Sequence, residues 1–296
     1  MNPLCDQCPR GCRVDRERGR GFCGVGKAFR VSRAALHPWE EPFLSGTRGS
    51  GTLFFSGCNL RCVFCQNREI SRGNVGKELS PEALEEVLLR LQEAGAHNLN
   101  LVTPTHYARE LVPVLERLKP RLRIPVVYNC GGYERVESLR HLEGLVDIYL
   151  PDFKYLDAVR AETYSGAADY GEVATLALEE MLRQQPRLEY DGEGMLLRGV
   201  AVRHLVLPGG RKDSLHLLRH LAEHFGTREY LLSLMSQYTP EFALDSPYPE
   251  LHRRVTTFEY ESVVKEAERL GFAGCIQDRS SASSSYTPDF YEERFL

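Results

Sequence analysis

The stretch Cys58-Asn59-Leu60-Arg61-Cys62-Val63-Phe64-Cys65 decides how the rest of this 296-residue chain can be interpreted. It follows the short apolar run Thr52–Ser56, which is typical of a buried strand. A loop that leaves a strand can turn its three thiolates toward one point. Structural zinc sites and most iron–sulfur clusters take four protein ligands, one more than this loop supplies. The spacing therefore favours an iron–sulfur cluster with one iron open to another ligand over three thiols that only pack in a core.

The composition argues against several classes of protein. Charged residues make up 26% of the chain and the formal net charge is −4, so no basic surface attracts it to nucleic acid or an anionic membrane. No apolar run approaches the roughly 20 residues of a membrane span. The N-terminal residues MNPLCDQCPRGC carry cysteines and charges where a signal peptide needs an apolar core. Nine cysteines without a leader indicate metal-bound or free thiols, and we expect a soluble, cytoplasmic protein.

A second group of cysteines lies in residues 1–35, a glycine-rich segment with few apolar side chains. Its members are Cys5, Cys8, Cys12 and Cys23, spaced C-x2-C-x3-C-x10-C. Four thiolates fit a closed site, either structural zinc or a second iron–sulfur cluster. The spacing does not choose between the two, and loose reduced thiols are the alternative. We predict a metal-binding segment here.

Beyond the cysteine loop, strands alternate with helices. We expect strands at Thr52–Ser56, Asn98–Val102, Val126–Asn129, Val146–Leu150, Val200–Leu207, Tyr230–Met235 and Phe272–Ile276, and helices at Pro81–Ala94, Arg109–Leu118, Arg135–Leu142, Ala174–Gln184, Asp213–Phe225 and Tyr260–Leu270. Repeated βα units predict a parallel sheet, and six or more favour an α/β fold of the partial (β/α)6 TIM-barrel type over residues 36–296. Chemistry in such folds lies at the carboxyl ends of the strands.

Polar residues follow several of these strands. Asp152 and Lys154, two apart at a strand end, can face one ligand or form a surface ion pair. Arg203, inside an apolar strand, needs an anion, a solvated cavity or a salt bridge in the barrel interior. The paired glycines of Asn129–Tyr133 allow close approach of the backbone to a ligand. Weaker candidates for a substrate pocket are Gln237, Tyr238, Gln277 and Asp278. We expect the serine-rich tail 279–288 to be a solvated loop or lid, and Cys130 and Cys275 to be core thiols.

Together these motifs resemble the pyruvate formate-lyase activating enzyme branch of the radical S-adenosylmethionine (SAM) superfamily, and look closest to activating-enzyme-like proteins with extra N-terminal cysteines. The resemblance covers residues 5–276 and is strongest at 58–67. It implies that Cys58, Cys62 and Cys65 bind a [4Fe-4S] cluster whose open iron chelates the amine and carboxylate of SAM. By the same resemblance Phe64 lies near the adenine, and Asp152, Lys154 and Arg203 (in Arg-x-x-x-x-Pro-Gly) contact SAM.

The chain departs from this branch at one position. The family usually has Gly-Gly-Glu after the second strand to receive the SAM amine, and here Val102-Thr103-Pro104-Thr105-His106 takes its place. We expect Thr103, Thr105 or backbone carbonyls to substitute. The N-terminal position of the second cysteine group also differs from many glycyl-radical activases, which insert such a domain after the radical SAM motif.

The resemblance implies an oxidoreductase that cleaves SAM reductively to a 5′-deoxyadenosyl radical for hydrogen abstraction, with no separate catalytic side chain because the cofactors supply the chemistry. Its partners would be a one-electron donor such as flavodoxin or ferredoxin, and a glycyl-radical enzyme as the protein it activates. The alternatives are another peptide or a small molecule as substrate, or a non-enzymatic iron–sulfur electron-transfer or sensor protein, which would leave Asp152, Lys154 and Arg203 without a ligand.

Overall fold

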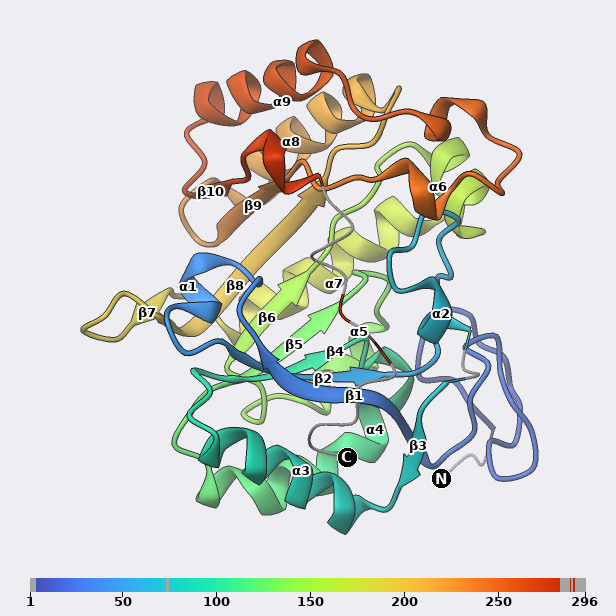
Figure 1. Cartoon of the computed structure of the whole chain (residues 1–296), viewed down its shortest axis with the longest axis vertical. Helices are drawn as coiled ribbons and strands as arrows, with labels where there is room; N and C mark the ends of the chain where they lie inside the picture. Colours follow the sequence, from blue (N-terminus) through green and yellow to red (C-terminus); the bar gives the residue numbers. More distant parts are fainter. Residues whose placement is uncertain (1–3, 73–74, 283–287, 289, 291–296) are drawn as a thin grey trace.

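The computed structural model describes residues 4–72, 75–282, 288 and 290. It confirms an α/β fold in which strands and helices alternate around one curved sheet (Figure 1). The strands are β1 (Phe29–His37), β2 (Ser50–Phe55), β3 (Lys77–Leu79), β4 (Leu99–Val102), β5 (Val126–Cys130), β6 (Ile148–Pro151), β7 (Glu189–Tyr190), β8 (Leu196–Leu205), β9 (Leu231–Met235) and β10 (Gly274–Ile276). The helices are α1 (Pro42–Ser45), α2 (Arg68–Ser71), α3 (Pro81–Glu93), α4 (Ala108–Leu118), α5 (Val136–Arg140), α6 (Ala158–Ser165), α7 (Tyr170–Gln184), α8 (Arg211–Phe225) and α9 (Thr257–Leu270).

The sheet is an open, mostly parallel barrel wall. Its strand order is β10-β9-β8-β6-β5-β4-β2-β1-β3, with β7 paired to β8. All neighbours from β2 to β10 pair in parallel, whereas β1, β3 and β7 pair antiparallel. Helices such as α3, α4, α8 and α9 cover the outer face (Figure 1). The carboxyl ends of the parallel strands therefore converge on one mouth.

Local sequence signals fix the ends of the long helices. Ser80 caps α3 by accepting a hydrogen bond from the backbone N–H of Ala83 at 3.2 Å. Thr256 and Glu259 cap α9 reciprocally, each side chain accepting from the other's backbone N–H. Gly271 ends α9 in the left-handed conformation, with φ of 81°. The predicted start of α3 and end of α9 are confirmed, whereas α9 begins at Thr257 and α7 at Tyr170, three and four residues before their predicted starts, and α6 was not predicted.

Strand β1, which was not predicted, lies antiparallel beside β2 with His37 opposite Ser50. Its burial does not alternate strictly along the strand, so period-two patterning does not reveal it. The predicted boundary between the cysteine-rich segment and the barrel, at residues 35 and 36, falls inside this strand. Of the serine-rich tail, Arg279–Ser281 form one 3-10 turn, and residues 283–287 lie outside the described part of the chain.

The interior of the barrel has an apolar layer below a polar one. Leu44 of α1 packs against Val127, Ile148, Ala201 and Leu231 near the starts of the strands. Above this layer the inward-facing side chains become polar, as described below. Within the described residues, every helix is too short or too polar to cross a membrane.

Candidate functional site

The three cysteines of the predicted cluster loop lie between β2 and α2, at the carboxyl end of β2. All three are half-buried. Gly57 begins the loop with φ of 86°, and a Cβ there would lie 2.6 Å from the carbonyl oxygen of Cys23. Only glycine fits this turn, so the loop packs directly against the N-terminal segment.

Two hydrogen-bond donors of the protein contact the sulfur atoms of this loop. The Ser165 hydroxyl, at the end of α6, donates to Cys62 Sγ at 3.0 Å. The backbone N–H of Leu60 donates to Cys58 Sγ at 3.3 Å. Such donors stabilise negative charge on cluster-bound sulfur.

The chemistry of this donor set fits a cluster with one open iron. Burial raises the pKa of Cys58, and burial together with the other two thiols raises that of Cys65 to about 12. Without a metal these thiols therefore keep their protons, and metal binding must displace them. Among the described residues no group of His, Cys, Asp or Glu has the geometry to enclose a single metal ion. A [4Fe-4S] cluster does not require that geometry, because each thiolate binds a different iron.

Asp152, Lys154 and Arg203 come together at the mouth, next to this loop. Asp152 Oδ1 accepts from Arg203 Nε at 2.9 Å, and Oδ2 accepts from Lys154 Nζ. Burial alone would raise the pKa of Asp152, but the two cations outweigh it and hold the pKa below its usual value. The side chains keep between 15% and 21% of their exposure, so a ligand can reach them.

The segment that replaces Gly-Gly-Glu lies at the end of β4. Thr103 has φ of 59°, a conformation that is strained for a β-branched residue. The Thr105 hydroxyl is buried and donates to Glu134 Oε1 at 2.6 Å. Thr105 is thus engaged with protein, while the strained backbone of Thr103 lies at the strand end where a glycine is expected.

Glu134 was not identified from the sequence. It follows the paired glycines after β5, is 2% exposed, and accepts a second hydrogen bond from the Tyr128 hydroxyl at 3.1 Å. Burial raises its pKa to about 7. Neighbouring protein atoms, not a ligand, occupy the space beside both glycines. A Cβ on Gly132 would lie 2.1 Å from the Asp152 carbonyl oxygen, and one on Gly131 would lie 2.9 Å from the Leu60 side chain.

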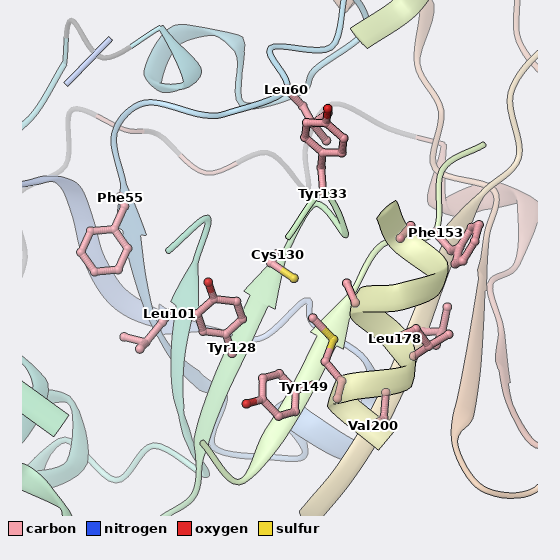
Figure 2. Close-up of a cluster of buried hydrophobic side chains, with 14 of the residues drawn as sticks. Phe55, Leu60, Leu101, Tyr128, Cys130, Tyr133, Tyr149, Phe153, Leu178 and Val200 are labelled. Atoms are coloured by element: carbon pink, nitrogen blue, oxygen red, sulfur yellow. The ribbon is translucent and has the colours of Figure 1, made fainter. Parts of the chain in front are cut away.

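Phe64 and Cys130 both pack within the protein. The Phe64 ring makes edge contacts with Tyr155, Tyr164 and Tyr238, with centroids 6.2 to 6.4 Å apart. Cys130 is buried in the main hydrophobic core between β5 and α7, as expected for a core thiol (Figure 2). The predicted contact of Phe64 with adenine concerns a ligand and stays a prediction.

The N-terminal cysteine segment sits on the same mouth. Arg10 donates from Nε to the Asn59 carbonyl at 2.7 Å and from Nη2 to the Ser165 carbonyl at 2.7 Å. Gln7 donates to Glu110 of α4 at 2.6 Å. Burial raises the pKa of Cys8 to about 12 and also raises that of Cys23.

The four thiols of this segment lie near one another. Cys5 and Cys23 lie close enough to Cys8, and Cys5 and Cys12 close enough to Cys23, to add to the burial that raises the pKa of Cys8 and Cys23. Their donor chemistry suits a tetrathiolate site, but no three of these four described residues are arranged around one metal ion in this structure. A second metal stays a prediction for this group.

Asn129, Glu40 and Glu41 also lie at the mouth, and the two glutamates carry no recognisable signal in the sequence. Arg203 donates from Nη2 to Asn129 Oδ1 at 2.5 Å and from Nη1 to Glu40 Oε2 at 3.4 Å, and Glu41 lies beside them. Glu40 and Glu41 stand between prolines in a segment that looks like a solvated loop. Their place inside the barrel depends on the path of α1, which the sequence pattern does not define.

Comparison with known proteins agrees with this geometry. The model of the radical SAM superfamily matches residues 52–172, which include the cysteine loop and the Asp152–Lys154 segment. An uncharacterised protein of Methanocaldococcus jannaschii is 31% identical over 277 residues, covering 90% of this chain and 74% of that protein. This chain belongs to the radical SAM superfamily. The superfamily implies a [4Fe-4S] cluster at which SAM is cleaved, and an electron donor.

Solved radical SAM structures share the fold at low sequence identity. A radical SAM methyltransferase from Sphaerobacter thermophilus aligns with a TM-score of 0.51 and 14% identity, over 77% of this chain and 66% of that one. SuiB of Streptococcus suis, bound to SAM, aligns with a TM-score of 0.51 and 11% identity, over 75% of this chain and 48% of that one. These similarities concern the fold alone.

Proposed function

We propose that this protein is a radical SAM oxidoreductase of the pyruvate formate-lyase activating enzyme-like branch. The observation that carries the proposal is the juxtaposition of the Cys58–Cys65 loop with Asp152, Lys154 and Arg203 at one mouth of the barrel. When bound, the [4Fe-4S] cluster supplies one electron that cleaves SAM to methionine and a 5′-deoxyadenosyl radical, which abstracts a hydrogen atom from the substrate.

The chain's own residues bind and orient the cofactors. Cys58, Cys62 and Cys65 hold the cluster, and Ser165 stabilises the sulfur of Cys62. Lys154 lies close enough to the cysteines for its charge to favour the thiolates, and its ion pair with Asp152 fixes its direction. The cations of Lys154 and Arg203 suit the SAM carboxylate, and Asp152 suits its ammonium group.

The substrate proposed here is either a glycyl-radical enzyme, attacked at a backbone glycine, or another peptide or small molecule. The first reading rests on the resemblance of the motifs to activating enzymes. The second rests on the replacement of Gly-Gly-Glu by a segment in which Thr105 is bonded to Glu134. We also propose that flavodoxin or ferredoxin delivers the electron, and that Cys5, Cys8, Cys12 and Cys23 hold a second metal.

The proposed function is tested by Cys62→Ala in anaerobically reconstituted protein. Loss of one cluster ligand should abolish formation of 5′-deoxyadenosine from SAM and dithionite while the fold survives, because Cys62 is a half-buried loop residue outside the strands and helices. Cys130→Ala, which removes a core thiol outside both groups, is the matched control and should retain the activity. Undiminished 5′-deoxyadenosine production by Cys62→Ala would refute the assignment.

A further inference from the structure

A cavity of about 350 Å³ opens on the side of the barrel, between the loop after β1 and the ends of β9 and β10. Trp39, Glu40 and Ser45 line it from the loop, and Gln237 and Gln277 line it from the strand ends. Both glutamines stand among the residues that the sequence suggested for a substrate pocket. We call this space the side cavity.

The side cavity is connected to the cluster loop by a chain of glutamines. Gln277 Nε2 donates to Gln237 Oε1 at 3.1 Å, and Gln66 Nε2 donates to the Gln237 carbonyl at 3.0 Å. Gln66 directly follows Cys65 in the sequence. Three glutamines therefore connect the side cavity to the proposed cluster loop through hydrogen bonds.

Glu40 connects the side cavity to a group of buried charged side chains. Glu40 lines the cavity, and the carboxyl groups of Glu41 and Asp152 lie near it, beside the cations Arg203 and Lys154. Both cations pair closely with Asp152. Arg203 reaches Glu40 only at 3.4 Å. Three carboxyl groups thus share two cations, and burial raises the pKa of both Glu40 and Glu41.

Two buried side chains in this group also keep unpaired polar atoms. Glu41 is 7% exposed, and its Oε2 has no hydrogen-bond partner among the described residues. Asn100 of β4 is fully buried with its amide nitrogen close enough to Glu40 to donate to that carboxyl, and its amide oxygen meets no hydrogen-bond partner in the described part of the chain. Buried polar groups left in this state are costly unless a ligand satisfies them.

We propose that Glu40 and Glu41 form a receptor for a cationic group of the substrate, an ammonium or guanidinium that enters through the side cavity. Such a group supplies a third cation to the three carboxyl groups and donates to Glu41 Oε2 and the side-chain oxygen Oδ1 of Asn100. Trp39, 59% exposed at the cavity wall, offers an aromatic face to the same cation. This assignment names the substrate class of the proposed enzyme and rests on that proposed function.

The test uses the fluorescence of Trp39, which is the only tryptophan in the chain. Cluster-loaded protein is titrated anaerobically with Nα-acetyl-lysine methylamide and Nα-acetyl-arginine methylamide. Their uncharged counterparts, the norleucine and citrulline methylamides, serve as controls. We expect a saturable change with at least one cationic probe and none with its uncharged counterpart. Absence of saturation with both cations, or equal binding of the uncharged probes, would overturn the proposal.

Variants locate the binding to the two carboxylates. Glu40→Gln and Glu41→Gln should each weaken the probe by about tenfold or more, the worth of one charge-assisted hydrogen bond. Glu179→Gln, on the exposed face of α7, is the control and should bind normally. Thermal unfolding and cluster absorbance check that each variant is folded and loaded. Unchanged affinity in the folded glutamate variants would refute the receptor.

SAM itself carries an ammonium group, so a further experiment tests whether the two carboxylates bind SAM or the substrate. If SAM displaces the lysine probe, or if Glu41→Gln weakens SAM binding as much as probe binding, the carboxylates serve SAM and the substrate receptor is wrong. The two proposals also fail separately. A protein that binds the probe but never cleaves SAM refutes the proposed function, whereas one that cleaves SAM and binds neither cation refutes the receptor.

Discussion

The guanidinium of Arg203 donates hydrogen bonds to three side-chain oxygen atoms. Its Nε donates to Asp152 at 2.9 Å, Nη2 to Asn129 at 2.5 Å and Nη1 to Glu40 at 3.4 Å. Simple removal of this side chain would leave buried carboxylates unpaired and destabilise the fold. A change that keeps the charge is therefore the sharper test of its role.

We predict that Arg203→Lys weakens SAM binding about tenfold, because lysine keeps the charge but loses the forked hydrogen bonds that orient Asp152 and the ligand. Cluster content should not change, since no iron ligand is altered. Anaerobic titration of SAM, with cluster absorbance as a check on loading, measures the effect. Arg183→Lys, in an exposed pair with Glu143, is the control. A SAM dissociation constant equal to that of the unmodified protein would remove Arg203 from the site.

Glu134 gives a prediction for pH dependence. Its pKa rises from 4.5 to about 7 on folding because the carboxyl is buried. The folded state therefore holds this proton more tightly, so the stabilisation is complete below pH 4.5 and is lost as the pH rises to 7. Glu134→Gln removes this titration. Between pH 5 and pH 8 the unmodified protein should lose about 2 to 3 kcal/mol of stability relative to the variant.

Urea unfolding of both proteins at pH 5 and pH 8 measures that difference. Other buried groups that titrate, such as His106 and His204, are present in both proteins and cancel in the comparison. Glu179→Gln, which is exposed, should parallel the unmodified protein. Stability curves of equal slope for the unmodified protein and Glu134→Gln would show that Glu134 is ionised normally in the folded state.

What the sequence reveals at this scale depends on how local the signal is. The cysteine loop could be recognised from the sequence because the spacing of its cysteines alone indicates the chemistry. Glu134 and Glu40 are not, because their partners Thr105 and Arg203 come from other strands. Only the folded arrangement of the strand ends brings these side chains together.

At the scale of elements, the capping box of α9 links a helix to the mouth of the barrel. Glu259 accepts from Thr256, pairs with Arg253 at 2.7 Å and accepts the Gly209 N–H at 2.8 Å. The helix start thus anchors the Pro-Gly turn that follows Arg203. The cap stabilises both structures together.

Thr256→Ala should cost about 1 kcal/mol of unfolding free energy, the usual worth of an N-cap hydroxyl. Ser262→Ala, in the middle of the same helix, is the control and should be close to neutral, because a serine that bonds back to the carbonyl four residues earlier does not stabilise a helix. Chemical denaturation of the two variants compares them. An equal loss of stability in both would mean that the capping box contributes nothing specific.

Local caps explain only part of what was predictable. The start of α3 and the end of α9 follow from Ser80 and Gly271. The start of α9, capped by Thr256, lies three residues before the predicted Tyr260, and α6 was not predicted although Asp157 and Gly166 cap it. In contrast, β1 lacks strict alternation, and its assignment depends on pairing with β2 and β3. Nor did sequence alone show that Thr103 adopts a positive φ at the end of β4.

At the scale of the whole molecule, the N-terminal segment and the barrel share one surface. Asp6 pairs with Arg109 and Arg135, and Arg16 lies 5.1 Å from the Tyr107 ring centroid, so the segment binds the starts of α4 and α5. The cysteines alone indicated a separate metal-binding segment. They did not indicate that it packs on the cluster loop, because the connecting arginines carry no motif.

The last prediction concerns the metal content of this segment. If Cys5, Cys8, Cys12 and Cys23 hold a metal, anaerobically prepared protein should contain more metal than one [4Fe-4S] cluster accounts for. Changing all four to Ser should remove this excess and leave the absorbance of the first cluster, because Arg10 and Gln7 still attach the segment to the barrel. Cys130→Ala should leave the metal content unchanged. An identical metal-to-protein ratio in the four-serine variant and the unmodified protein would make these four residues ordinary reduced thiols, whereas loss of the excess would give the mouth of this barrel a second metal beside the first.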